Sequence, residues 1–262
     1  MTEKPLPPNI KSLLAFYAES VRGQSNVPVL LRTVCEKLEI KVRREPGVPA
    51  GKAFLSWNRQ VEKRPTILLP LRQHKTWDRF CAAHELGHFF LISEYGWIPA
   101  DKDAYWQTEE LCDYFARELL IPQKYLKDVT AASLKLLLRD CDALSEKSLV
   151  PWNQVARRIS EASRNFFLVL EPSSRGGYRV TMSTLPNRQG TSIEIATEML
   201  APEVCSALEA ARQTKKRVYI GGEPHSVVRG KLGELLEKKG TTKVVARVLA
   251  SGSKLQIAAT QS

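Results

Sequence analysis

The stretch FCAAHELGHFF, residues 80–90, holds two of the four histidines in a chain of 262 residues. His84 and His88 are four positions apart, and Glu85 directly follows the first of them. Residues four apart on an α-helix share one face, so both imidazoles can face the same ion. Glu85 would project about 100° away around the helix. It is therefore placed to reach a water molecule beside that ion, but not to act as a third ligand.

Two interpretations of this spacing are open. HExxH is the motif of zinc peptidases, in which the glutamate is the general base. The motif fixes only three residues, however, and chance matches occur. The alternative is a buried helix that carries two hydrogen-bonded histidines. A third ligand at a suitable place would decide between the two.

The segment TEELCDYFARELLIP, residues 108–122, offers that ligand. Its apolar spacing predicts a helix over about 108–120 that stops before Pro122. Glu109 and Asp113 are four apart on it. An antiparallel arrangement would bring Glu109 to the histidines, and three protein ligands leave a fourth position open, as in catalytic zinc sites. Asp113 would accept the second N–H of a ligand histidine and fix its tautomer. Alternatively, Glu109 is not a ligand, and its carboxylate in the first turn of the helix only interacts favourably with the helix dipole.

The rest of the chain predicts an α+β protein. Helical spacing occurs at 9–22, 28–38, 75–92 and in short segments over 122–163, and strand patterns occur at 39–45, 47–57 and 64–70. From about residue 165 the pattern changes to strands at 165–171, 177–184, 216–222, 243–250 and 254–260, with helical stretches at 201–213 and 229–238. We expect three parts: a mainly helical, zincin-like domain with a small sheet (1–125), a helix-turn-helix-like segment (126–163), and a C-terminal α/β domain (164–262).

The composition favours an acidic partner. Lysine and arginine number 39 against 28 acidic residues, a net charge of +11. This excess suggests nucleic acid, although a generally basic surface is an equal alternative. For the basic clusters near predicted strands, a solvated face is the favoured interpretation. The alternative is a surface that contacts nucleic acid through Lys215, Lys216, Arg217, Lys238 and Lys239. Arg157 and Arg158 lie on a helix that either faces phosphate or, the favoured interpretation, braces the first domain.

The cysteines and the N-terminal sequence indicate the cellular compartment of the protein. The five cysteines are scattered and form no CxxC pair, which fits a reducing environment. The N-terminus shows no signal-peptide pattern, and no apolar stretch reaches membrane-spanning length. We therefore expect a cytoplasmic protein without a membrane partner.

The two motifs together resemble the ImmA/IrrE family of bacterial metallopeptidases. RFCAAHELGHFFL and EELCDYFARELLIP are similar to the family's R-F-x-x-A-H-E-x-x-H and its downstream E-x-x-A-N-x-F-A-x-x-L-L-M-P. The resemblance implies that His84, His88 and Glu109 hold Zn²⁺, with Mn²⁺ possible in its place, and that Glu85 is the base. Asp113 stands where the family usually has Asn, and Cys112 where it has Ala.

The resemblance also implies a function and partners. Longer members continue from the peptidase through a helix-turn-helix-like segment into a GAF-like sensor domain. They cleave a helix-turn-helix repressor after DNA damage or phage infection, and single-stranded DNA is the expected activator. The competing interpretation is a non-catalytic DNA-binding regulator with a structural metal site, since structural sites commonly use Cys and His.

Two finer points stay open at this stage. Cys112 is three residues after Glu109 and shares its side of the helix. Its thiolate could fill the fourth metal position as an inhibitory contact, or Cys112 could be a small packing residue, which is the favoured alternative. The developing oxyanion needs a further donor, and Tyr95, Tyr105 and Tyr114 are the candidates.

Overall fold

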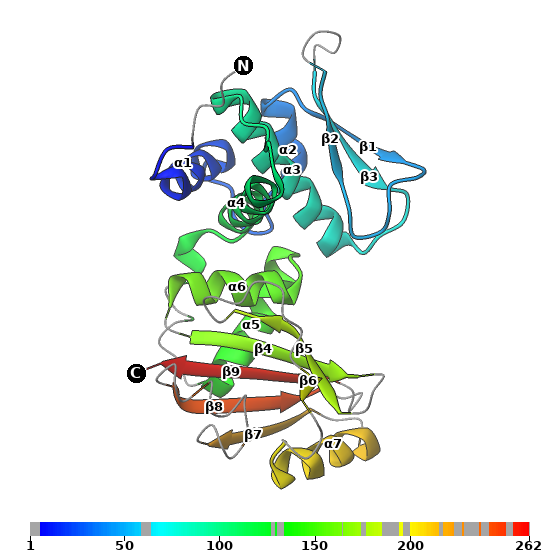
Figure 1. The fold of residues 1–262 in the computed structure, drawn as a ribbon, viewed down its shortest axis with the longest axis vertical. Coiled ribbons are helices and arrows are strands. Elements are labelled where there is room, and N and C mark those ends of the chain that lie inside the picture. The colour runs from blue at the N-terminus through cyan, green and yellow to red at the C-terminus, as the bar shows by residue number, and fades with distance from the viewer. Residues whose placement is uncertain are drawn as a thin grey trace. The chain divides into compact units, whose positions relative to one another are not determined.

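A computed structural model describes the chain over residues 6–58, 64–126, 129, 134–163, 165–173, 177–184, 194–195, 200–214, 217–222, 227, 236, 241–249 and 254–261. The chain divides into two compact units (Figure 1). The first comprises residues 1–124 and 144–155, and the second residues 125–143 and 156–262. Both helices and sheets are present, so the α+β fold class is confirmed. No helix in the described part of the chain is long and apolar enough to cross a bilayer.

Helices dominate the first unit. Its elements are α1 (Ile10–Arg22), α2 (Leu31–Lys37), β1 (Lys41–Glu45), β2 (Phe54–Ser56), β3 (Thr66–Pro70), α3 (Lys75–Tyr95), α4 (Lys102–Leu120) and the single 3₁₀ turn η1 (Gln123–Tyr125). The strands form a sheet of order β1-β3-β2, with β1 parallel and β2 antiparallel to β3. The predicted strand at 47–57 is shorter than expected, because its first half is a turn at Gly47, Gly51 and their neighbours.

Capping residues end α3 and begin α4 at the two ends of the loop that connects them. Gly96 takes a left-handed conformation, φ 62°, and its N–H bonds to Ile92 O while Trp97 N–H bonds to Leu91 O. This is the glycine-terminated cap that ends many helices. Asp101 then accepts a hydrogen bond from Ala104 N–H at 2.8 Å and starts α4. The prediction that this helix starts near residue 108 was therefore wrong: the Asp101 cap begins it at Lys102.

The second unit is built on an antiparallel sheet of six described strands in the order β6-β5-β4-β9-β8-β7. The strands are β4 (Asn165–Pro172), β5 (Tyr178–Ser183), β6 (Glu194–Ile195), β7 (Val218–Gly222), β8 (Thr241–Val248) and β9 (Leu255–Gln261), with helix α7 (Pro202–Thr214) between β6 and β7. Apolar side chains from α7 and the inner strands form one buried cluster, including Val204, Leu208 and Ile257. The helix predicted at 229–238 lies outside the described residues except for Leu236.

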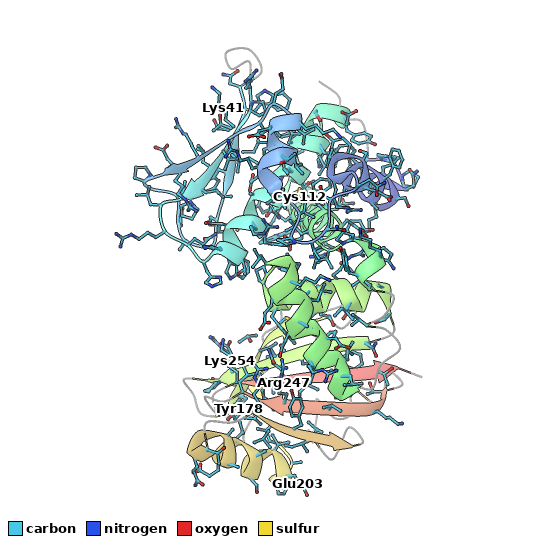
Figure 2. All side chains as sticks on the ribbon, turned by 180° about the vertical axis from the view of Figure 1, so that it is seen from behind. Lys41, Cys112, Tyr178, Glu203, Arg247 and Lys254 are labelled. Carbon is cyan, nitrogen blue, oxygen red and sulfur yellow. The ribbon has the colours of Figure 1, made fainter. Side chains whose placement is uncertain are left out.

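A buried ion cluster fastens helix α5 (Leu134–Ser148) to this sheet within the second unit. Arg247 on β8, labelled in Figure 2, is only 1% exposed, and its guanidinium donates to both oxygens of Asp142 at 2.6 and 2.8 Å. Gln256 accepts from Arg247 Nε at 2.9 Å. A buried arginine requires such partners, because an unpaired buried charge is very costly.

Helix α6 (Trp152–Ala162) follows α5 after a short turn, in the segment predicted to be helix-turn-helix-like. Its side chains are largely buried, and Arg158 is only 4% exposed, 3.9 Å from Glu161. Arg157 is partly buried. A recognition helix must present an exposed face to DNA, so this burial favours the interpretation of α6 as a brace.

Candidate metal centre

Helices α3 and α4 lie in close contact at Gly87 and Cys112. A β-carbon placed on Gly87 would lie 2.9 Å from the Cα and 3.3 Å from the Sγ of Cys112. Any side chain at position 87 would therefore force the helices apart. Sequence reasoning missed this role of Gly87. The available signal was a glycine inside a helical pattern, which costs helix stability and so indicates a close approach.

The close crossing brings Glu109 to both histidines. Glu109 Oε2 lies 3.4 Å from His84 Nε2, and Glu109 Oε1 lies 3.3 Å from His88 Nε2. The two imidazole rings are 5.0 Å apart between centroids. The three predicted ligand residues therefore converge on one point between α3 and α4, with side chains that are 14–29% exposed.

These separations fit a metal ion. In a tetrahedral zinc site with N and O ligands about 2.0–2.1 Å from the ion, neighbouring ligand atoms are about 3.3–3.4 Å apart. A good N–H···O hydrogen bond is shorter, with its mode near 2.9–3.0 Å. The spacing of Glu109 from the two Nε2 atoms is compatible with three ligands around one ion, although without an ion these groups contact one another as an ion pair. The residues present fit a zinc ion with an open fourth position.

Asp113 contacts the outer nitrogen of His84. Asp113 Oδ1 lies 2.8 Å from His84 Nδ1. A carboxylate oxygen accepts, so this contact puts a proton on Nδ1; in a neutral ring, the Nε2 lone pair would then be available to a metal ion. Burial opposes the charged form of His84, but hydrogen bonds to Asp113 and Glu109 outweigh it and raise its pKa to about 9. Hydrogen bonds from His84 and His88 hold the pKa of Glu109 well below its ordinary value.

Glu85 lies beside this group on α3 and is 7% exposed. Burial raises its pKa, while the nearby His88 and His84 and a hydrogen bond from the Leu55 backbone oppose that shift. Leu55 is the middle residue of β2, the edge strand next to α3. The sheet therefore holds the carboxylate predicted to act as the base.

Cys112 offers a second possible ligand set. Its Sγ and the nitrogens of His84 and His88 lie within 4.8 Å of one another. The thiol is fully buried, and burial raises its pKa well above the ordinary value. Glu109 is the better third ligand, because its oxygens lie closer to the histidines and its carboxyl group is already ionised.

Among the three tyrosines considered as oxyanion donors, Tyr105 lies at the site. It is one turn before Glu109 on α4, and burial and the nearby Glu109 charge raise its pKa. Its side chain is 45% exposed. Tyr95 packs against Phe90, and Tyr114 lies under Lys11. The geometry thus favours Tyr105.

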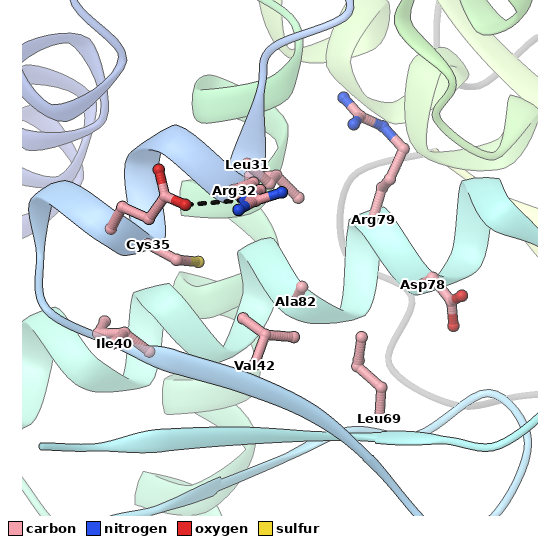
Figure 3. A pocket seen from close by; sticks show the side chains of 10 residues that line it. Leu31, Arg32, Cys35, Ile40, Val42, Leu69, Asp78, Arg79 and Ala82 are labelled. Atoms are coloured by element: carbon pink, nitrogen blue, oxygen red, sulfur yellow. Dashed lines mark hydrogen bonds and ion pairs between the residues drawn. The ribbon is translucent and has the colours of Figure 1, made fainter.

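A cavity of about 480 Å³ lies on another face of α3. Ala82 lines it, and Ala82 is about 200° around the helix from His84. Figure 3 shows apolar side chains such as Cys35 and Val42 around it, together with the Arg32–Glu36 ion pair. No residue of the candidate metal centre is among its lining residues, so it is a separate feature.

The residues predicted to contact nucleic acid are mostly untested by the structure. Lys215, Lys216, Lys238 and Lys239 lie outside the described residues. Arg217 is described; its guanidinium donates to Asp142 Oδ2 at 2.8 Å, and its side chain is 54% exposed. Arg217 therefore helps to satisfy the buried Asp142 as well as facing solvent.

Comparisons with known proteins bear on the family and the fold of the chain. No curated protein matches the sequence. A solved structure described as a "Mycobacterium tuberculosis transcriptional regulator" resembles 96% of this chain and 76% of its own, with a TM-score of 0.53 and 12% identity, a likeness of fold alone. The sequence model of the Peptidase_M78 family, described as "IrrE N-terminal-like domain", matches residues 35–160. That range contains both helices of the candidate centre, and this part of the chain is accordingly an IrrE N-terminal-like domain of the Peptidase_M78 family.

Proposed function

We propose that this protein is a zinc-dependent, site-specific endopeptidase. The observation that carries the proposal is the position of Glu109, 3.3–3.4 Å from the Nε2 atoms of both HExxH histidines. His84, His88 and Glu109 would hold the ion. A bound zinc ion would act as a Lewis acid toward the scissile carbonyl and a water molecule.

Side chains of the protein would then transfer the proton and stabilise the negative charge that develops on the carbonyl oxygen. Glu85 would take a proton from the attacking water and deliver it to the leaving amine. Its burial beside the edge strand excludes bulk water, and the Leu55 amide fixes its orientation. Tyr105 would donate a hydrogen bond to the oxyanion. Asp113 keeps the His84 ring oriented through Nδ1.

We further propose that the substrate is a helix-turn-helix repressor and that single-stranded DNA activates its cleavage in a DNA-damage or phage-defence response. The resemblance to ImmA/IrrE peptidases supports this substrate, and the solved structure of similar fold is described as a transcriptional regulator. The net charge of +11 supports a nucleic-acid ligand. The second unit would be the GAF-like sensor.

The deciding experiment uses the zinc-loaded full chain and the repressor encoded next to its gene. We expect cleavage at one bond, faster with single-stranded DNA, and none with Glu85→Gln. Intact-mass analysis of the fragments would locate the bond. Zinc bound at one equivalent without cleavage under any of these conditions would refute the peptidase proposal.

The alternative, a DNA-binding regulator with a structural metal, rests on the nearness of Cys112 to the histidines. Four closed positions would leave no place for water. X-ray absorption of the zinc-loaded protein, read together with the cleavage assay, separates the two proposals: a Zn–S distance near 2.3 Å without any cleavage supports the structural site, and a shell of N and O atoms alone supports the peptidase.

A further inference from the structure

A buried arginine, Arg117, lies beside Asp113, the carboxylate that contacts His84. Arg117 lies four residues after Asp113 on α4, so the two share one face of the helix. Asp113 Oδ1 is 2.8 Å from His84 Nδ1, and its other oxygen, Oδ2, is 3.8 Å from Arg117 NH1. The Arg117 side chain is 6% exposed. The two oxygens of one carboxylate thus face a histidine and an arginine.

Arg117 is in turn held by a residue of another helix. Its NH1 donates to Gln154 Oε1 at 3.1 Å, and Gln154 is 6% exposed. Gln154 belongs to the first turn of α6, and Arg117 and Gln154 both lie in the first compact unit. The same nitrogen, NH1, faces Asp113 Oδ2, and the planar guanidinium holds it in a fixed direction relative to the rest of the group. Gln154 therefore helps to keep NH1 beside Asp113.

We propose that Arg117 is a positioning residue of the metal centre, and that the chain Gln154–Arg117–Asp113–His84 ties the orientation of the His84 ring to the start of helix α6. This inference rests on the proposed metal site but not on proteolysis. Asp113 Oδ2 faces Arg117, and the Asp113 side chain is 35% exposed. Without Arg117 the carboxylate would be free to rotate toward water and release Nδ1.

The inference gives α6 a role beyond bracing. Outer partners of metal-bound histidines commonly change metal affinity about 10- to 100-fold when they are removed. A shift of the first turn of α6 would move Gln154 and so relax the His84 ring. Helix α6 continues past Val155, where the first unit ends, into residues of the second unit. The chain of contacts therefore supplies a route by which α6 can adjust the centre.

The test compares Arg117→Met with Arg22→Met. Arg22 also anchors α4, but at the end of the helix, where it donates to Glu118 O at 2.8 Å. Zinc affinity is measured by competition with a chelator. We expect Arg117→Met to weaken it about 10-fold, and Arg22→Met to leave it unchanged. In the Asp113→Ala background, Arg117→Met should have no further effect, because Arg117 acts through Asp113.

A second measurement does not need the metal. In the metal-free protein, histidine-ring NMR should show a protected, downfield Nδ1 proton on His84. We expect Arg117→Met and Gln154→Leu to lose that protection and Arg22→Met to keep it. If Arg117→Met does not fold, Gln154→Leu decides the matter, since it removes an acceptor of Arg117 NH1 and leaves the guanidinium in place.

An unchanged ring signal and unchanged affinity in the folded variants would overturn the proposal, as would additive effects of Arg117→Met and Asp113→Ala. A wild-type protein that binds no zinc would end the proposed function, and the ring signal would still decide the role of Arg117.

Discussion

The backbone of Cys112 occupies the space that a side chain at Gly87 would need, with only 2.9 Å between the Cys112 Cα and the position of a β-carbon on Gly87. This contact fixes how near α4 can come to α3. The distance between Glu109 and the two histidines depends on it, because those residues flank the crossing. The glycine of the HExxH stretch is therefore part of the geometry of the centre.

Gly87→Ala should weaken metal binding and lower stability. The added methyl group must push α4 outward, and overpacking of this kind costs about 1–3 kcal/mol. Gly96→Ala is the matched control: its left-handed φ of 62° makes alanine unfavourable, but it lies outside the crossing. Urea unfolding and chelator competition would follow both variants. Equal zinc affinity in Gly87→Ala and wild type would contradict the prediction.

Glu85→Gln should preserve the fold and the bound zinc while abolishing cleavage. Glutamine is nearly isosteric but cannot accept the water proton, and losing a general base costs about 10²- to 10⁴-fold in rate. Glu110→Gln serves as the control, because Glu110 is exposed and pairs with Lys11 rather than with the centre. Cleavage by Glu85→Gln at the wild-type rate would show that another group is the base.

The Cys112→Ala variant distinguishes a packing role of Cys112 from inhibition of the metal centre by its sulfur. We expect unchanged basal cleavage and a loss of stability of about 1 kcal/mol, since the thiol is fully buried against Gly87 and small-for-small changes leave small cavities. A sulfur that occupies the fourth metal position would instead give higher cleavage without activator. The rate measured in the absence of DNA is the deciding quantity.

The metal-free protein should lose stability as the pH rises from about 6.5 to 9. The pKa of His84 is raised from 6.5 to about 9 in the folded state. Folding therefore favours protonated His84; this contribution is fully present below pH 6.5 and is lost as the pH passes 9. The change should not exceed about 3 kcal/mol. Urea unfolding with a chelator would measure it, and a His84→Gln variant should show a flatter profile.

Reversing Lys215 and Lys216 to Glu should weaken single-stranded DNA binding and flatten its salt dependence. Arg217 is left intact in this variant, because its ion pair with Asp142 belongs to the buried cluster around Arg247. Fluorescence anisotropy at several salt concentrations gives the slope. An unchanged slope and affinity would place the DNA-contacting residues elsewhere.

Local patterns in the sequence predicted the centre better than they predicted the sheets. The i, i+4 spacings of His84 with His88 and of Glu109 with Asp113 follow from helix geometry alone, so the faces of α3 and α4 could be inferred. The strand order could not, because β4 pairs with β9, a partner far along the chain. The two-residue strand β6 also escaped prediction, since so short a segment carries no periodicity.

Contacts between residues that are distant in sequence were also not predicted. Gly87 against Cys112, and Gln154 against Arg117, join residues whose identities carry no motif. The early start of α4 was hidden by the aromatic and proline residues before it, although Asp101 was a suitable cap. Such features need the three-dimensional packing of neighbouring elements to be known.

The short α3–α4 connection has a consequence for how the centre assembles. All three proposed ligands come from two consecutive helices, and the loop between them is pinned by the Gly96 cap and by Trp97, whose indole N–H donates to Thr108 at 2.8 Å. Closing a short loop costs little chain entropy, and contacts between neighbours in sequence form quickly. The hairpin can therefore bring its imidazoles and carboxylate together early in folding, so an ion captured at that stage would act as a nucleus around which the small sheet and the outer helices condense.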